Sequence, residues 1–170
     1  MDKSDEWNHD SLKAMAQHRA ELNFNIKLND FAKESSGIEG AKDIESIRGE
    51  CLMLKSLLDF SILSVDILSD HNSHGELRAR GGMNASVGRH VPPPGGISIV
   101  YALEELLDET ESGASPYEIH RRFETLHPYT DGNGRIGRAI WLWMMVNNYD
   151  YDLRNGFLHQ WYYQSLEAGR

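Results

Sequence analysis

Apolar residues recur at helical spacing along most of this chain. Between Gly40 and Asp66 they fall at intervals of three and four, the period of one face of an α-helix. A segment from about Ser11 to Ser35 also has a helical pattern, with a less regular apolar stripe. The positions that define the stripes are Leu12, Met15, Leu22, Phe24, Ile26, Leu28 and Phe31, then Ile44, Ile47, Cys51, Leu54, Leu58, Ile62 and Val65.

Three further helices are predicted in the second half of the chain. The first runs from Ile97 to Glu109, and the second from Pro116 to Leu126 after Ser115, because Ser followed by Pro suits an N-cap and a first helical residue. The third runs from about Gly134 to Asn147 and is apolar on all sides over residues 139–146. A helix without a polar face belongs at the centre of a bundle.

Residues 71–96 separate the two groups of helices. They are rich in glycine and contain Pro92, Pro93 and Pro94 in succession, so helix cannot continue through them. We expect a loop that includes a small β-hairpin. The fold class is therefore predicted to be all-α, a helical bundle with one hairpin, forming a single domain over residues 1–170.

Composition excludes several classes of function. The formal net charge of -9 argues against a nucleic-acid partner, because such binding needs clustered basic residues. Cys51 is the single cysteine, so no internal disulfide can form and a reducing compartment fits. The first residues, 1–7, lack the apolar stretch of a secretory signal, and no apolar run reaches the roughly 18 to 20 residues of a membrane span. We expect a cytoplasmic protein with no membrane partner.

One loop between two predicted helices, residues 127–138, concentrates the polar chemistry. Gly132 and Gly134 flank Asn133 directly before a helix, where flexible backbone and unpaired N–H groups can bind an anion. Arg135 and Arg138 share one face of that helix, where each cation costs on the order of 0.3 to 1 kcal/mol near the N-terminus. A phosphate or carboxylate partner reverses that cost, which explains the arginines.

The same loop offers a base and a metal ligand. His127 precedes a proline, which should end the helix and leave the imidazole at the mouth of the loop. Asp131 is suited to hold a magnesium ion that also binds substrate phosphates. Each residue alone is compatible with a cap or an ordinary turn, but together they favour phosphoryl or nucleotidyl transfer.

Residues 127–138 resemble the signature of the Fic family: His, any residue, Phe, any residue, Asp or Glu, Gly-Asn-Gly-Arg, two variable residues, and Arg. Only Tyr129 departs from it, in place of Phe. The resemblance implies an enzyme that transfers AMP from ATP to a Tyr, Ser or Thr hydroxyl of a target protein, the chain itself included. By position it implies that His127 is the base, that Asp131 binds Mg²⁺, that Gly132, Asn133, Gly134 and Arg135 hold the α- and β-phosphates, and that Arg138 reaches the terminal phosphate.

A second match lies far upstream. Residues 35–40, from Ser35 through Glu39 to Gly40, resemble the inhibitory motif of the family, Ser or Thr, three residues, Glu, then Gly or Asn. The resemblance implies that Glu39 forms a salt bridge with Arg138 and forces ATP into an unproductive pose. Residues from about 11 to 45 would then form an inhibitory helical segment, and residues from about 46 to 170 the catalytic core. A helix cap followed by a Glu remains the alternative.

Two further stretches resemble parts of the family. Residues 87–94 are similar to the segment after the target-binding hairpin, which places that hairpin at about Gly75 to Val87, although a rigid proline turn is equally compatible. Residues 161–166 are similar to the segment beside the adenine, which implies nucleotide contacts from Tyr162 and Tyr163. An aromatic stripe that belongs to the core is the alternative there.

Three other functions stay open at this point. A module with the same anion site could bind a nucleotide without catalysis, as a sensor. Members of the family also transfer other phosphate-containing groups, or remove AMP. The sequence does not identify the target protein. It also leaves the oligomeric state open, and a homo-oligomer is one of the possibilities.

Overall fold

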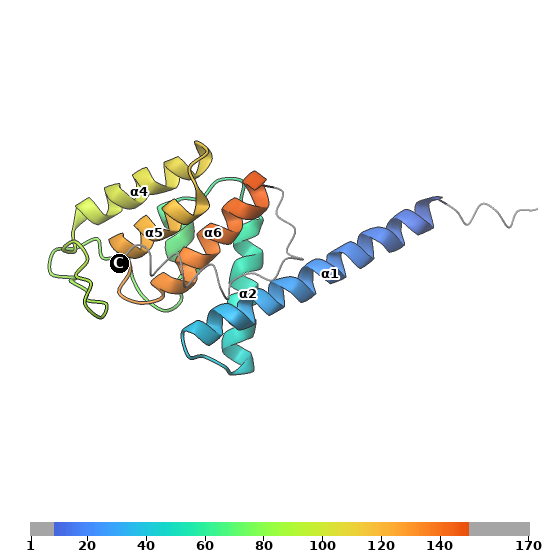
Figure 1. Cartoon of the computed structure of the whole chain (residues 1–170), viewed down its shortest axis with the longest axis horizontal. Coiled ribbons are helices and arrows are strands. Elements are labelled where there is room, and N and C mark those ends of the chain that lie inside the picture. Colours follow the sequence, from blue (N-terminus) through green and yellow to red (C-terminus); the bar gives the residue numbers. More distant parts are fainter. Residues whose placement is uncertain (1–8, 150–170) are drawn as a thin grey trace, which may run out of the picture.

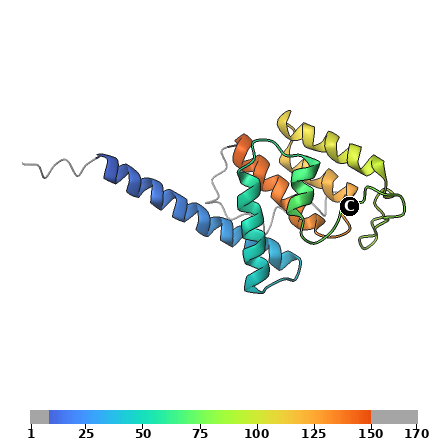
Figure 2. The ribbon, with the colours of Figure 1, turned by 180° about the vertical axis from the view of Figure 1, so that it is seen from behind.

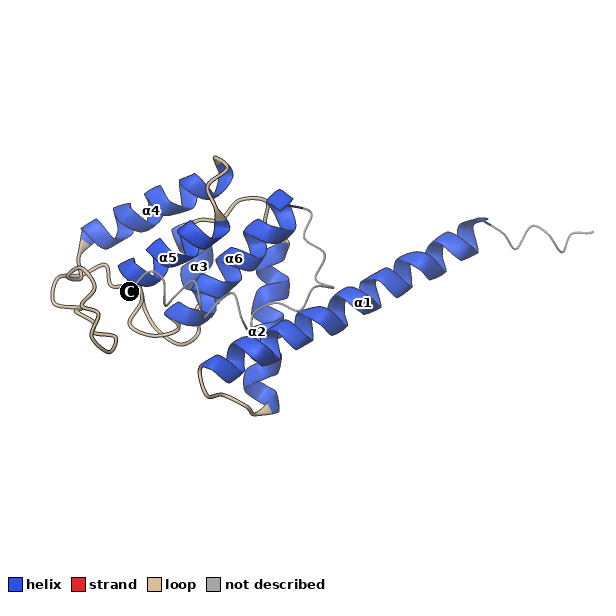
Figure 3. Cartoon of the chain, in the orientation of Figure 1, coloured by secondary structure: helices blue, strands red, loops and turns tan. Residues whose placement is uncertain are grey.

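The protein is a bundle of helices. A computed structural model describes residues 9–149, and within this range no strand is present (Figure 3), which confirms the predicted all-α fold. The helices are α1 (His9–Ile38), α2 (Ile44–Leu58), α3 (Val65–His71), α4 (Ile97–Glu111), α5 (Pro116–Leu126) and α6 (Asn133–Tyr149). No helix in the described part of the chain is both long enough and apolar enough to cross a bilayer.

The centre of the bundle is α6, as its uninterrupted apolar run predicted. It packs against α5, α2 and α1 (Figure 1). The residues from Ala139 to Met144 are all buried. Trp143 is only 1% exposed, and its indole Nε1 donates a hydrogen bond to the carbonyl oxygen of Phe60 at 2.8 Å. This bond satisfies the polar atom of a large buried side chain. The N-terminus of α6, where the arginines lie, is thereby fixed to a rigid core.

The prediction of one continuous helix from Gly40 to Asp66 was wrong, because the helix is interrupted between the end of α2 and the start of α3. The second of these helices starts after Ser64, whose hydroxyl accepts a hydrogen bond from the backbone N–H of Ile67 at 3.2 Å. This is an N-cap, a local alternative to continuing a helix. The apolar period extends across the break through Ile62, which lies in the connection and is 54% exposed.

The long helix α1 packs on the bundle only through its C-terminal part. Leu28, Phe31 and Ala32 are buried there, beside α2 and α6. The earlier turns extend away from the bundle (Figures 1 and 2), and the apolar side chains on them are exposed, contrary to the predicted stripe. These exposed residues are Leu12, Met15, Leu22, Phe24 and Ile26.

The predicted hairpin between Gly75 and Val87 is not formed. In the described residues this region has only isolated bridges, and its first part pairs with the loop before α6 instead of with itself. The N–H of Arg78 donates to the carbonyl of Pro128 at 2.8 Å, and the N–H of Thr130 donates to the carbonyl of Glu76 at 2.9 Å. Gly75 permits this pairing, because a Cβ atom there would overlap the backbone of Asp131.

Arg78 connects this region to the end of α5. Its side chain is fully buried, and all its bonds in the described structure go to backbone carbonyls: Nε to His127 at 2.7 Å, Nη2 to Leu126 at 3.0 Å, and Nη1 to Met83 at 3.1 Å and Pro93 at 2.9 Å. Carbonyls at a helix C-terminus lack intrahelical donors, and a guanidinium supplies several at once. One side chain therefore fixes the end of α5 and two points of the region between α3 and α4.

We expect Arg78→Ala to lower the free energy of unfolding by about 3 to 5 kcal/mol, because buried carbonyls lose a charged donor and a cavity is left. Arg80→Ala is the matched control: among the described residues the Arg80 side chain pairs with Glu76 alone, and it is 74% exposed, so a change within about 0.5 kcal/mol is expected. Urea unfolding followed by circular dichroism measures both. Equal effects of the two variants would contradict the structural role of Arg78.

Candidate active site

His127 is placed by the end of α5. As predicted, the helix stops at this residue, which adopts a left-handed conformation with φ 48° and ψ 62°. It is the only residue other than glycine with positive φ in the described chain, and such a conformation costs on the order of 1 to 3 kcal/mol. The bonds from Arg78 to His127 O and from His127 N to Phe123 O, at 2.7 and 2.8 Å, hold the residue in place.

The surroundings of His127 favour a neutral imidazole. Burial is the largest cause of a lowered pKa, and the positive charges of Arg78 and His90 lower it further, whereas Asp131 opposes them. Burial and like charges both disfavour a charged imidazolium. A neutral ring at neutral pH can accept a proton, so the residue is suited to act as a general base.

Tyr129 and Asn133 close the loop between α5 and α6. Tyr129 is fully buried, and burial raises the pKa of its hydroxyl to about 12. The side chain of Asn133 accepts from the N–H of Tyr129 at 2.9 Å and donates to its carbonyl at 2.8 Å. Tyr129 therefore anchors the loop where the family pattern has Phe. Because the amide of Asn133 is occupied, any contact of this residue with phosphate must come from its backbone N–H.

Gly132 provides the sharp turn into α6. It has φ +79°, and a Cβ atom there would overlap the side-chain amide of Asn72. That amide donates to the carbonyl of Asp131 at 2.9 Å and accepts from the N–H of His74 at 3.2 Å. Asn72 thus fixes the loop from the opposite side. No sequence pattern indicated this role, because Asn72 directly follows a short helix, α3, whose position was not predicted.

Asp131 is exposed at the tip of the loop. Its Oδ1 accepts a hydrogen bond from the N–H of Gly132 at 2.6 Å, and no described residue hydrogen-bonds to its Oδ2. In the described residues it belongs to no group of three or more His, Cys, Asp or Glu side chains that could hold a metal. One exposed carboxylate fits Mg²⁺, which takes one or two carboxylates together with water and substrate phosphates.

The first turn of α6 offers backbone donors. The N–H groups of Asn133, Gly134 and Arg135 have no acceptor among the described residues, as expected at a helix N-terminus. These groups carry the positive end of the helix dipole. The predicted anion site is therefore a helix N-terminus preceded by a left-handed glycine.

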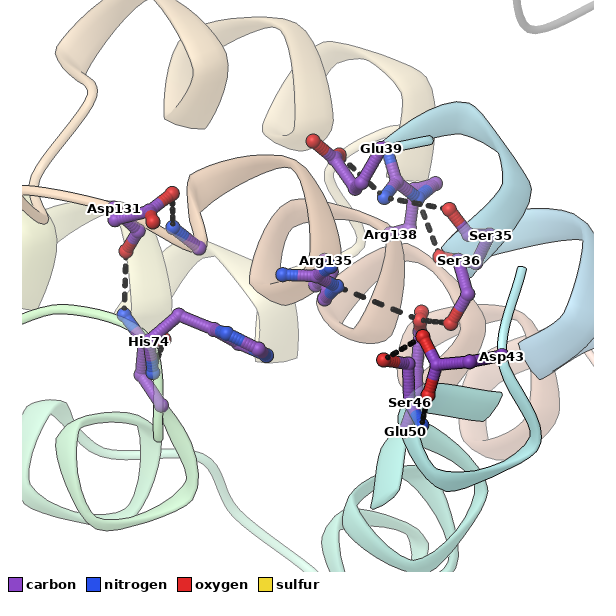
Figure 4. A network of polar contacts seen from close by, with 12 residues as sticks. Ser35, Ser36, Glu39, Asp43, Ser46, Glu50, His74, Asp131, Arg135 and Arg138 are labelled. Atoms are coloured by element: carbon purple, nitrogen blue, oxygen red, sulfur yellow. Dashed lines mark hydrogen bonds and ion pairs between the residues drawn. The ribbon is translucent and has the colours of Figure 1, made fainter. Parts of the chain in front are cut away.

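Arg138 is paired with residues of α1 and the turn that follows it (Figure 4). Its Nη2 lies 2.7 Å from Oε1 of Glu39, its Nε donates to Ser35 Oγ at 2.6 Å, and Nη2 also donates to Ser35 O at 3.2 Å. Arg138 and Ser35 are 1% and 0% exposed. A Cβ atom on Gly134 would overlap the Glu39 carboxylate, which therefore lies against the first turn of α6. The structure thus brings the two separate motifs together.

Glu50 pairs with the other arginine and was missed from the sequence. Its Oε2 lies 3.7 Å from Nε of Arg135 and accepts from Ser36 Oγ at 2.5 Å. The residue is 4% exposed and lies on the buried face of α2 with Leu54 and Leu57. A signal was present, because a glutamate at an apolar position of an amphipathic helix requires a polar partner.

A second buried pair, also missed, lies beneath α6. Burial lowers the pKa of His120 to about 4, and burial raises the pKa of Glu124 to about 7 against the opposing charge of Arg138. Both side chains approach Gly137, where a Cβ atom would contact them. The ring of His120 is 2% exposed, and its position between Ile119 and Phe123 on an apolar face was the available signal.

The predicted adenine contacts cannot be placed. Tyr162 and Tyr163 lie outside the described residues.

The comparison with protein families agrees with the geometry. The sequence model of the Fic/DOC family matches residues 58–145, which span α3 to α6 and include every residue of the loop motif. No curated protein sequence matches the chain. Because the match covers more than half of the chain and includes His127, Gly132, Gly134 and both arginines in one site, the chain belongs to the Fic/DOC family.

Proposed function

We propose that this chain is a protein adenylyltransferase that transfers AMP from ATP to a hydroxyl of a target protein and is held inactive by Glu39. Members of the Fic/DOC family are typically transferases, and the general activity follows from the family. The observation that carries the finer proposal is the Glu39 carboxylate paired with buried Arg138 at the first turn of α6. An anionic side chain occupies the place suited to a phosphate.

The described side chains supply what the transfer requires. His127, with its lowered pKa, takes the proton of the target hydroxyl, whose oxygen attacks the α-phosphorus of ATP. The bond from the α-phosphorus to the bridging oxygen breaks, and pyrophosphate leaves. The free N–H groups of Gly134 and Arg135 face the developing charge of the phosphates. Mg²⁺, held by Asp131 and the phosphates, would neutralise part of that charge.

Glu39 restrains the reaction by competition for Arg138. A guanidinium binds carboxylate and phosphate oxygens with the same donors, so it cannot pair with Glu39 and the terminal phosphate at once. ATP that binds without this contact would lie out of line for attack, and small misplacements reduce rates strongly. Arg138 is 1% exposed and the Glu39 side chain is 35% exposed, so one partner of the pair is shielded from water, which makes this restraint stronger than a salt bridge between two exposed side chains.

We expect Glu39→Gly to raise transfer of AMP at least about tenfold over wild type, equivalent to about 1.4 kcal/mol, because Arg138 becomes available to the terminal phosphate. Glu111→Gly is the matched control, since Glu111 is exposed at the end of α4; it should leave transfer unchanged. Intact-protein mass spectrometry after incubation with magnesium and ATP detects AMP added to the chain itself.

Adding His127→Ala to Glu39→Gly should abolish the adduct, because no other described group at this site replaces the base. ATP binding should persist in the double variant. ATP bound normally by Glu39→Gly with no adduct on the chain or on proteins of a lysate would refute the transferase and favour a nucleotide sensor.

The lowered pKa of His127 predicts the position of the acid limb of activity. Since the neutral ring is the base, activity falls only when pH drops through this pKa, so kcat/KM of Glu39→Gly should hold to below about pH 6.5, the ordinary value for histidine. Removing one cause of the shift, with His90→Gln, should move the limb to higher pH. An acid limb above pH 6.5, or one unmoved by this substitution, would argue against His127 as the titrating base.

A further inference from the structure

We propose that Glu50 is a positioning residue that holds Arg135 ready for nucleotide phosphate and couples this arginine to the inhibitory residues of α1 through Ser36. The inference rests on the proposed function, because it assigns Arg135 to ATP.

The first observation is the burial of Glu50. Its side chain is only 1% exposed, so the carboxylate cannot turn into solvent. Both of its polar contacts in the described structure fall on Oε2, which accepts from Ser36 Oγ at 2.5 Å and lies 3.7 Å from Arg135 Nε. Its Oε1 is buried with no hydrogen-bond partner in that part of the chain. A buried carboxylate is retained at such a cost only beside a cation, and Arg135 is that cation.

The second observation is the side from which Glu50 approaches Arg135. The nearest approach is between Nε and Oε2, at an ion-pair distance of 3.7 Å, and no hydrogen bond joins either terminal Nη atom to a described residue. In Figure 4, Arg135 lies between Glu50 on one side and the Asp131 loop on the other. A guanidinium whose Nε side faces the carboxylate, with no hydrogen bond at its terminal nitrogens, can offer those two nitrogens to the oxygens of a phosphate. Glu50 therefore orients the arginine without occupying the donors that a nucleotide would use.

The third observation is that neighbouring residues of α1 contact both arginines. Ser35 and Ser36 are each fully buried; the first accepts from Arg138, and the second donates to Glu50, which pairs with Arg135. Glu39, one turn later, also holds Arg138. Any displacement of this turn that releases Arg138 must also remove the serine donor from Glu50. The charge of Glu50 would then be balanced by Arg135 alone, which tightens their pairing as the site opens.

A double-mutant cycle in the Glu39→Gly protein tests the orientation of Arg135. The dissociation constant of magnesium-ATP is measured by titration calorimetry for the Glu39→Gly parent, with Glu50→Gln, with Arg135→Ala, and with both. We expect Glu50→Gln to raise the dissociation constant about fivefold and Arg135→Ala at least as much, with no further loss in the combined variant. Independent, multiplicative losses, or unchanged or tighter binding with Glu50→Gln, would overturn the proposal.

Controls separate orientation from folding. Gln keeps the size of Glu50 and can still accept from Ser36, and Glu50→Asp, which keeps the charge, should restore part of the affinity that Gln loses. Equal losses with Gln and Asp would overturn the role of the charge. Glu45→Gln, on the exposed side of the same helix, should bind like the parent. Thermal unfolding of each protein establishes that the compared variants are folded.

The link to α1 has its own test. Ser36→Ala in the wild-type chain removes the donor to Glu50, so Arg135 becomes its only partner in the described structure, and ATP affinity should change at least twofold only while Glu50 is present. An equal change in the Glu50→Gln background would overturn the coupling. Because the readout is ATP binding, coupling without AMP transfer would overturn the proposed function alone, and transfer without coupling would overturn this inference alone.

Discussion

The site depends first on one buried arginine, Arg78, and on the carbonyls that it gathers. Its guanidinium bonds to the end of α5 and to two points of the loop region, while its backbone N–H pairs with Pro128. The guanidinium of Arg78 thus holds together chain segments that form no helix or strand of their own. The hydrogen bond from Arg78 to the carbonyl of His127 helps to hold this residue in its unfavourable left-handed backbone conformation.

How much could be predicted from the sequence depended on the range of each interaction. The candidate site residues from His127 to Arg138 are contiguous in the sequence. Their glycines, proline and arginines act through local backbone geometry, so the candidate site could be predicted from this one segment. Glu39 was found only because a family pattern links it to Arg138 across the chain, and the structure confirms that salt bridge. The limits of α5 were also local, set by Ser115, Pro116 and the proline after His127.

The other features of the fold and of the site could not be predicted from the sequence, because they depend on contacts between residues that are distant in the sequence. Arg78, Asn72 and Glu50 look like ordinary polar residues until their distant partners are known. The break between α2 and α3 was hidden because Ile62, in the connection, continues the apolar period although its side chain is exposed. The N-terminal turns of α1 do not contact the bundle, so their apolar side chains stay exposed. A hydrophobic pattern identifies residues that could be buried, but it does not show whether another element packs against them.

The pairing of Glu39 with Arg138 joins two parts of the same chain. A tethered group competes at an effective concentration fixed by its linkage, on the order of millimolar or above, whatever the concentration of the protein. Dilution therefore cannot loosen this contact, and a weakly binding anion cannot displace it. Release of Arg138 therefore requires either a ligand that competes at this effective concentration or a movement of α1 that withdraws Glu39.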